Sequence, residues 1–432
     1  MASPIVIAGG TVVDQLSERK VDLLLINGVI ADSGAPGAFD GQGESVDASD
    51  AIVMPGLVDI QVHFRTPGGE ESEDISSGAA GAALGGVTAC VMMPNTIPTI
   101  DNVEIVSDVL SLARDAACDV RTSAAITVER AGEQLVDFAA LHRAGVRVFT
   151  DDGWVVDDAK LMEAALRETL ELPGAVISQH AEHSEMVAGG VLNAGTVAER
   201  LGLPGRPREA EAVIVERDIA LAAKTGGRYH VLHMSTSLAT EQVRRAKQAG
   251  LRVTAEVTPQ HLILTEEDVE RLGSAGIMNP PLRLATDASA LRSALLDGTV
   301  DAVATDHAPH HPRLKQMPLA EVPPGMLGVE TMASVIWDTF VNGGSMSRQQ
   351  FVAVTSSQPA RIADIHEHGQ PLTPGNPANI AVFDPNKAWA IEGSSLQSKS
   401  TNTPWQGQQF IGKVRHTICR GSLVVQDGLL VH

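Results

Sequence analysis

Side chains that can bind a metal ion follow apolar runs at five distant points of the sequence. His63, His180 and His233 lie at the ends of "LVDIQVHF", "AVISQHAE" and "YHVLHMS". Asp152 and Asp306 follow "VRVFT" and "DAVAT" in the same way. Imidazole and carboxylate are ligands that suit zinc, and a bound zinc ion can activate a water molecule at neutral pH. One such histidine alone is most often an ordinary core or surface residue, but five together indicate a metal-dependent hydrolase.

Other polar residues near these runs have both a chemical and a purely structural interpretation. Asp306 could take a proton from an attacking water molecule and deliver it to a leaving nitrogen. Arg65, two residues past His63, could form a simple salt bridge, but a clamp for a carboxylate group is the sharper hypothesis. The pair Asp151 and Asp152 in "FTDDGW" is also typical of a turn, and its place at a strand end favours a ligand role for one of the two.

Eight apolar, β-branched runs alternate with Ala-, Leu- and Glu-rich segments of helical spacing over residues 55–365. This alternation predicts an α/β fold, a (β/α)8 barrel of the TIM type, in which chemistry occurs at the C-terminal ends of the strands. The expected strands are "LVDIQVHF", "VTACVMMPN", "VRTSAAIT", "VRVFTDD", "AVISQHAE", "YHVLHMS", "RVTAEVTP" and "DAVATDHAP".

The two ends of the chain have a different pattern from the middle. Residues 1–54 and 366–432 contain short apolar runs separated by Gly, Asp and Asn turns, such as "PIVIAGGTVVD" and "GSLVVQDGLLVH". Such runs predict small β-strands. We therefore expect one small β-sandwich domain built from both termini.

Composition limits the kinds of partner that the protein can have. The 432 residues carry a net charge of −21, which argues against binding nucleic acid or an anionic membrane. An anionic substrate would need a local cation. Cys90, Cys118 and Cys419 have no paired spacing, and no signal peptide or membrane-spanning run is apparent, so we expect a cytoplasmic protein.

A series of motifs in order resembles bacterial class I dihydroorotases, which belong to the cyclic amidohydrolase superfamily. The motifs are "PGLVDIQVHFRTPG", "MPNT", "FTDDG", "YHVLHMST", "AEVTPQHLILT", "MNPPLR", "ATDHAPH", "PPGMLGVET" and "SKSTNTPWQG". The resemblance covers almost the whole chain. It implies the reversible cyclisation of N-carbamoyl-L-aspartate to L-dihydroorotate in pyrimidine biosynthesis.

The resemblance also implies roles for individual residues. One zinc ion would use His63, a histidine two residues before it, and Asp306, while a second would use His180 and His233. Asp152 would bridge the two ions, and Asp306 would be the general acid and base. The substrate residues implied are Arg65, Asn95 and His310 at the carboxylate and Asn279 near the ring, although Asn95 and Asn279 could also be simple turn formers.

The sequence departs from the family pattern at Gln61, which stands where the first histidine is usual. An amide oxygen is a poorer zinc ligand than imidazole, so we expect one or two zinc ions per chain, with the first site doubtful.

Two functions stay open: a dihydroorotase with an altered metal site, and a non-catalytic scaffold for aspartate carbamoyltransferase. A hydantoinase or allantoinase is less expected, because those enzymes usually have a metal-bridging lysine on the fourth strand, where this chain offers Arg147. A homodimer and a mobile loop near residues 315–325 are further expectations.

Overall fold

The computed structural model describes residues 3–431 and contains the expected barrel. Its eight strands are β8 (Leu57–Val62), β9 (Val87–Met92), β10 (Asp119–Thr122), β11 (Val148–Phe149), β12 (Val176–Gln179), β15 (Tyr229–Val231), β16 (Val253–Val257) and β17 (Ala302–Val303). Every neighbouring pair is parallel. Parallel bridges between Ala124 and Phe149 and between Val62 and His307 join β10 to β11 and β8 to β17, which closes the ring. The prediction of a (β/α)8 barrel is confirmed.

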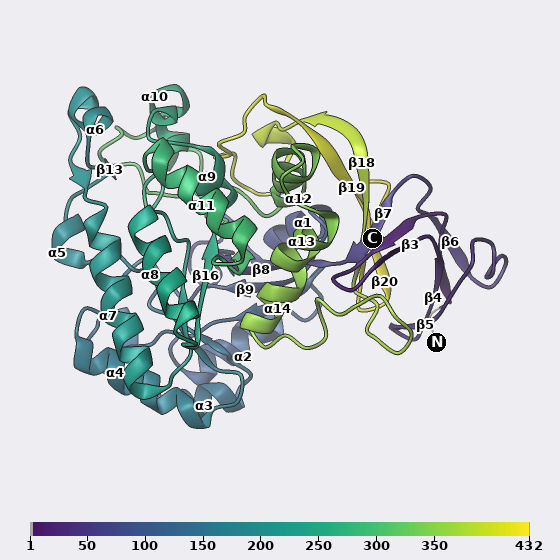
Figure 1. Cartoon of the computed structure of the whole chain (residues 1–432), viewed down its shortest axis with the longest axis horizontal. Coiled ribbons are helices and arrows are strands. Elements are labelled where there is room, and N and C mark those ends of the chain that lie inside the picture. The colour runs from purple at the N-terminus through teal and green to yellow at the C-terminus, as the bar shows by residue number, and fades with distance from the viewer. Residues whose placement is uncertain (1–2, 432) are drawn as a thin grey trace.

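Helices cover the outside of this ring (Figure 1). The longer ones are α1 (Ile75–Leu84), α2 (Val103–Leu112), α4 (Ala159–Glu168), α7 (Glu209–Thr225), α8 (Ser237–Gln248) and α11 (Ala285–Asp297). The short ones are α3 (Phe138–Arg143), α5 (Ser184–Val187), α6 (Thr196–Leu201), α9 (Pro259–Ile263), α10 (Asp268–Leu272), α12 (Met332–Ile336), α13 (Arg348–Val352) and α14 (Gln358–Ile362).

Side-chain caps fix where several of these helices begin. Asp74 accepts a hydrogen bond from the Ser77 amide at the start of α1, and Thr236 accepts one from the Ala239 amide at the start of α8. Such caps satisfy amides that have no partner within the helix. The loops at the C-terminal ends of the strands form the mouth of the barrel, and the caps set where each of these loops becomes a helix.

Strands from both ends of the chain form two sheets beside the barrel. One sheet has the order β5–β4–β1–β6, and the other has the order β21–β20–β19–β18–β7–β2–β3. Their bounds are β1 (Ile5–Ala8), β2 (Thr11–Val13), β3 (Glu18–Arg19), β4 (Asp22–Ile26), β5 (Val29–Gly34), β6 (Glu44–Asp47), β7 (Ile52–Pro55), β18 (Ile380–Ala390), β19 (Gln409–Cys419), β20 (Ser422–Gln426) and β21 (Leu429–Leu430).

The two ends of the chain pair directly in the second sheet. β7 runs antiparallel to β18, so the purple and yellow strands lie side by side in Figure 1. Apolar side chains from both ends, such as Ile7, Leu23, Ile380 and Ile418, share one buried cluster. The sheets thus combine both termini as the sequence predicted, while the domain boundaries at 54/55 and 365/366 stay a prediction.

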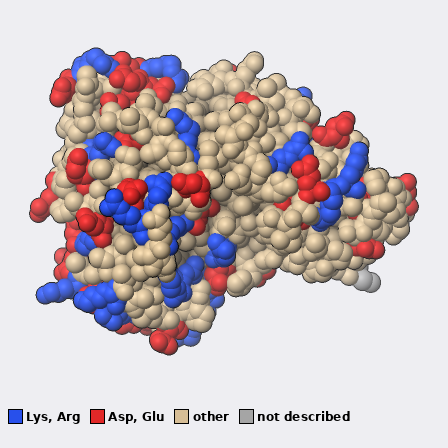
Figure 2. Space-filling model, in the orientation of Figure 1, with Lys and Arg blue, Asp and Glu red and all other residues tan. Residues whose placement is uncertain are grey.

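The surface agrees with the composition. On the face drawn in Figure 2, basic and acidic side chains are interspersed over the barrel and are not gathered by sign. Over residues 3–431, no helix is both long enough and apolar enough to cross a lipid bilayer.

Candidate metal and substrate site at the mouth of the barrel

Three of the predicted metal ligands meet at the mouth. His180 Nδ1 lies 3.0 Å from His233 Nε2. Asp152 Oδ1 lies 3.4 Å from His233 Nε2 and 3.7 Å from His180 Nδ1. All three residues are buried, and they follow β12, β15 and β11. Residues far apart in the sequence therefore direct one oxygen and two nitrogen atoms at a common point.

The spacing of these three atoms fits a zinc ion. Four ligands in a tetrahedron, with bonds of about 2.0–2.1 Å, lie roughly 3.3–3.4 Å from one another. The observed separations of 3.0, 3.4 and 3.7 Å lie around this value. Two imidazoles and a carboxylate are also a donor set that suits zinc among protein side chains. Asp152, His180 and His233 thus form a candidate metal site.

Glu182 orients His180 from the side away from this site. Its Oε2 atom lies 3.3 Å from His180 Nε2, and Arg206 and Arg283 hold the same carboxylate at 2.7 and 3.1 Å. Burial lowers the pKa of His180, but the carboxylates of Asp152 and Glu182 outweigh it and raise the value to about 9. A carboxylate that accepts the far N–H of a histidine leaves the other nitrogen free to bind metal. Sequence analysis missed Glu182, although "HAEH" places it two residues after His180.

His63 and Asp306 lie on the other side of Asp152. His63 Nε2 is 2.9 Å from Asp306 Oδ1 and 3.4 Å from Asp152 Oδ2. Asp152 thus presents one oxygen to His180 and His233 and the other to His63. His63 Nδ1 lies 2.9 Å from Asn95 Oδ1, which fixes the imidazole ring. Asn95 was predicted to contact substrate, and its carbonyl oxygen is directed at His63 in this structure.

Gln61 is buried between these residues, and its amide N–H is directed at Asp152. Its Nε2 atom donates a hydrogen bond of 3.3 Å to Asp152 Oδ1. Its Oε1 atom is buried and has no hydrogen-bond partner among residues 3–431. An amide nitrogen cannot bind a cation, because its lone pair is delocalised and its hydrogens point outward. The donor set on the His63 side is therefore weaker than the set on the His180 side.

The structure distinguishes the two adjacent aspartates. Asp151 accepts hydrogen bonds from the amides of Ile126 and Thr127, at 2.8 and 3.0 Å, and from the Thr127 hydroxyl. Its carboxylate is therefore occupied in holding the neighbouring strand end. Burial would raise the pKa of Asp152, but contacts with His180, His233 and His63 lower it well below the usual range. Asp152 is the member of the pair that lies with His180 and His233.

Arg65 and His310 come together at the same end of the barrel. Arg65 donates to the Pro309 carbonyl oxygen at 3.1 Å, and one of its terminal nitrogens lies 3.4 Å from His310 Nε2. His310 Nε2 also lies 2.8 Å from the Pro324 carbonyl oxygen. Asn402, from the C-terminal segment, accepts a hydrogen bond from the His310 amide at 3.3 Å. Sequence analysis did not assign Asn402, because nothing local links residue 402 to residue 310.

A cavity of about 530 Å³ opens beside His180. Its wall includes His180, Glu182, Trp154 and Asn279, and residues 320–324 close one side. In its favoured orientation the Asn279 amide accepts a hydrogen bond of 3.0 Å from Arg206. The cavity is large enough for a small ring compound. Asn279 thus lines the cavity, and Arg206 links it to Glu182.

Three mouth residues have backbone conformations that are uncommon outside glycine. The φ angles are 55° at Arg65, 29° at His233 and 48° at Asp306. Such left-handed conformations cost free energy and cluster at functional sites, where surrounding contacts hold them. In this barrel they occur just after three separate strands and turn the side chains into the mouth.

A closed barrel with a buried Asp–His–His cluster and a second carboxylate, Asp306, beside it is typical of the cyclic amidohydrolase class. Comparison with known proteins gives the family. The protein-family model described as "Dihydro-orotase-like" matches residues 50–239. Two dihydroorotases of 40–41% identity cover at least 95% of the chain, so the chain belongs to the dihydroorotase family.

Curated relatives match over nearly their full lengths. A dihydroorotase of Mycobacterium tuberculosis is 41% identical over 413 residues, covering 95% of this chain and 96% of that protein. A dihydroorotase of Pelotomaculum thermopropionicum is 40% identical over 428 residues, covering 99% of each.

Solved structures are similar in fold. An L-hydantoinase (dihydropyrimidinase) from Arthrobacter aurescens is 23% identical and has a TM-score of 0.89, covering 100% of this chain and 98% of that chain. A dihydropyrimidinase from Brevibacillus agri is 24% identical with a TM-score of 0.86, covering 99% and 96%. At this identity the likeness concerns the fold alone.

Proposed function

We propose that this protein is a dihydroorotase, which interconverts N-carbamoyl-L-aspartate and L-dihydroorotate. Cyclisation joins the carbamoyl nitrogen to the side-chain carboxyl carbon with loss of one water molecule, and hydrolysis reverses this step. The observation that carries the proposal is the convergence of Asp152, His180, His233 and Asp306 at the mouth of a barrel whose relatives are dihydroorotases.

Each mouth residue has a proposed role in this reaction. Arg65 and His310 bind the substrate carboxylate, with Asn95 contributing its free amide N–H groups. Asn279 contacts the ring. Asp306 takes a proton from water during ring opening and delivers it to the leaving nitrogen; in cyclisation it acts in reverse. Its contact of 2.9 Å with His63 holds the carboxylate toward Asp152 and the metal site.

We propose that Asp152, His180 and His233 hold one tightly bound zinc ion. When bound, zinc polarises the reacting carbonyl and lowers the pKa of a water molecule. His63, Asp306 and Asp152 lack a fourth good metal ligand, because Gln61 directs its N–H at Asp152. A second ion is therefore held weakly or not at all.

The scaffold alternative is not favoured. Asp306, Arg65 and the Asp–His–His cluster are all in place, and their roles are chemical. A hydantoinase is also not favoured, since Arg147 forms an ion pair of 3.3 Å with Asp364 and cannot bridge two metals as a carbamylated lysine does. A homodimer, a complex with aspartate carbamoyltransferase, and a cytoplasmic location stay predictions.

The test is an assay of carbamoyl aspartate cyclisation with the purified chain and added zinc. We expect zinc-dependent turnover in both directions. Dihydrouracil, which lacks the carboxylate, is the control substrate, and we expect it to be hydrolysed far more slowly than dihydroorotate. An inactive wild type alongside an active Gln61→His variant would favour the scaffold, while faster hydrolysis of dihydrouracil would favour a hydantoinase.

A further inference from the structure

Lys315 is a buried lysine beside the proposed carboxylate site. It lies on η4 (Leu314–Gln316), a short turn in the segment after β17, and only 9% of the residue is exposed. Its ammonium group donates one hydrogen bond, of 3.0 Å, to the Pro323 carbonyl oxygen. An ammonium group has three N–H donors, so two are left for another acceptor. Pro323 itself lines the cavity beside His180.

Arg65 and His310 are the basic groups nearest to Lys315. Burial lowers the pKa of Lys315 to about 7, and the charge of Arg65 adds to the effect. Burial likewise lowers the pKa of His310 to about 3, with Arg65 and Lys315 contributing in that order. Lys315 and His310 bind the carbonyl oxygens of two consecutive residues, Pro323 and Pro324, and His310 Nε2 lies 3.4 Å from Arg65, so the three basic groups are near neighbours. They come from three segments, after β8, after β17 and on η4.

No carboxylate forms an ion pair with Lys315 or with Arg65 within residues 3–431. Arg65 instead donates to a carbonyl oxygen and faces His310. Lys315, which is buried, and Arg65, which is half-buried, thus have carbonyl oxygens as their hydrogen-bond acceptors.

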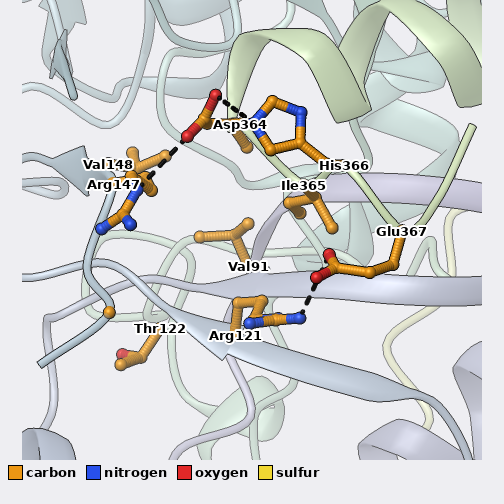
Figure 3. Close-up of a pocket in the computed structure, with 11 residues that line it drawn as sticks. Val91, Arg121, Thr122, Arg147, Val148, Asp364, Ile365, His366 and Glu367 are labelled. Atoms are coloured by element: carbon orange, nitrogen blue, oxygen red, sulfur yellow. Dashed lines mark hydrogen bonds and ion pairs between the residues drawn. The ribbon is translucent and has the colours of Figure 1, made fainter. Parts of the chain in front are cut away.

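The other buried Arg or Lys among residues 3–431 is Arg283, and it has its own anion. Arg283, which is 2% exposed, pairs with Glu182 at 3.1 Å. Two partly exposed arginines beside a cavity of about 180 Å³ are also paired: Arg147 with Asp364, and Arg121 with Glu367 (Figure 3). A buried cation without an anion costs several kcal/mol of desolvation, and an anion from outside the chain would offset this cost.

We propose that Lys315 is a second cationic contact for the substrate carboxylate, acting beside Arg65 and His310. The two free N–H groups of Lys315 and the Arg65 guanidinium would both donate to it. This inference rests on the proposed function. It makes Lys315 a specificity residue that selects rings bearing a carboxylate over uncharged rings.

The experiment measures binding, so it does not depend on turnover. Orotate, a planar ring with the same carboxylate, and orotamide, its uncharged amide, are titrated into the zinc-loaded protein by calorimetry. The proteins are wild type, Lys315→Met, Lys315→Arg and Arg65→Met. We expect Lys315→Met to weaken orotate on the order of tenfold to hundredfold and orotamide less than threefold, with Lys315→Arg retaining most of the orotate affinity.

The outcomes separate the inference from the proposed function. If Lys315→Met weakens both ligands equally, Lys315 only braces the loop through Pro323, and the inference is wrong. The inference also fails alone if Arg65→Met weakens orotate but Lys315→Met does not. If wild type binds orotate no better than orotamide, the site does not select a carboxylate and the proposed function itself is undermined.

Discussion

Two regions of the barrel contain similar charged groups but differ in how those groups are satisfied. In the cavity beside Arg147, Asp364 accepts from Arg147 at 3.3 Å and lies 3.0 Å from His366. At the mouth, His180 and His233 face each other at 3.0 Å, and Lys315 lacks an anion among the described residues. The first region is complete without a ligand. The second leaves imidazole nitrogens and a positive charge without partners among the described residues. This is expected of a site that binds a metal ion and an anionic ligand.

The largest effect is expected from the acid and base. Asp306→Asn removes the proton carrier while keeping the side-chain shape, so kcat for dihydroorotate hydrolysis should fall about 10²- to 10⁴-fold. Asp364→Asn changes a carboxylate beside Arg147 in the same way and serves as the control, with an expected rate within about twofold of wild type. Equal losses in the two variants would erase the distinction between the regions.

The next effect concerns the residue that orients His180. Glu182→Gln removes the carboxylate that accepts the far imidazole N–H, so zinc affinity should fall about 10- to 100-fold. Competition with a chelating dye measures this affinity directly. Glu367→Gln, which loses a carboxylate 3.6 Å from Arg121 while Asp119 stays at 2.9 Å, is the matched control and should bind zinc as wild type does. Unchanged zinc affinity in Glu182→Gln would mean that Glu182 does not hold His180 in its metal-binding orientation.

A smaller gain is expected at Gln61. Gln61→His replaces an N–H donor with an imidazole nitrogen beside His63 and Asp152. The variant should hold a second zinc ion and raise kcat several-fold, measured by metal analysis and by the cyclisation assay. A variant that still binds a single ion would show that the side chain at position 61 does not limit the site.

The smallest expected effect is on stability, and it depends on pH. The pKa of Lys315 is lowered from 10.5 to about 7 in the folded protein, so the unfolded chain binds more protons between these values. Its buried charge therefore destabilises the folded state fully below about pH 7 and progressively less as the pH rises toward 10.5. Arg65 and His310 are the basic groups that face it.

Lys315→Met should accordingly raise the Tm of the ligand-free protein, and by more at about pH 6 than at about pH 9. Thermal unfolding of variant and wild type at both pH values checks this. Lys399→Met, which alters a lysine paired with Asp74, is the control and should not stabilise the protein. A Tm difference that grows with pH would show that the buried ammonium of Lys315 does not destabilise the folded state.

The sequence predicts the barrel well because its signal is local. Each apolar run such as "YHVLHMS" is continuous, and the residues that follow it must lie at the mouth once the barrel closes. The sequence alone left Asp151 and Asp152 both open as metal ligands, and only the resemblance indicated Asp152. Only the structure shows that Asp151 is occupied by the amides of Ile126 and Thr127.

Other features could not be predicted, because they depend on contacts between distant segments. Asn402 supports the backbone of His310 from the C-terminal segment. Lys315 lies in a Pro-rich loop, where neither periodicity nor spacing distinguishes a buried lysine from an exposed one. The role of Gln61 depends on which end of its amide faces Asp152, and the residue type does not decide that.

The most direct test is a crystal structure of the protein, purified without chelator, with an anomalous difference map collected at the zinc edge. We expect one strong peak in contact with Asp152, His180 and His233, a weak peak or none beside Gln61 and His63, and no peak beside Arg147. No peak at His180 and His233, or two peaks of equal height at the mouth, would contradict the proposed single tight zinc site.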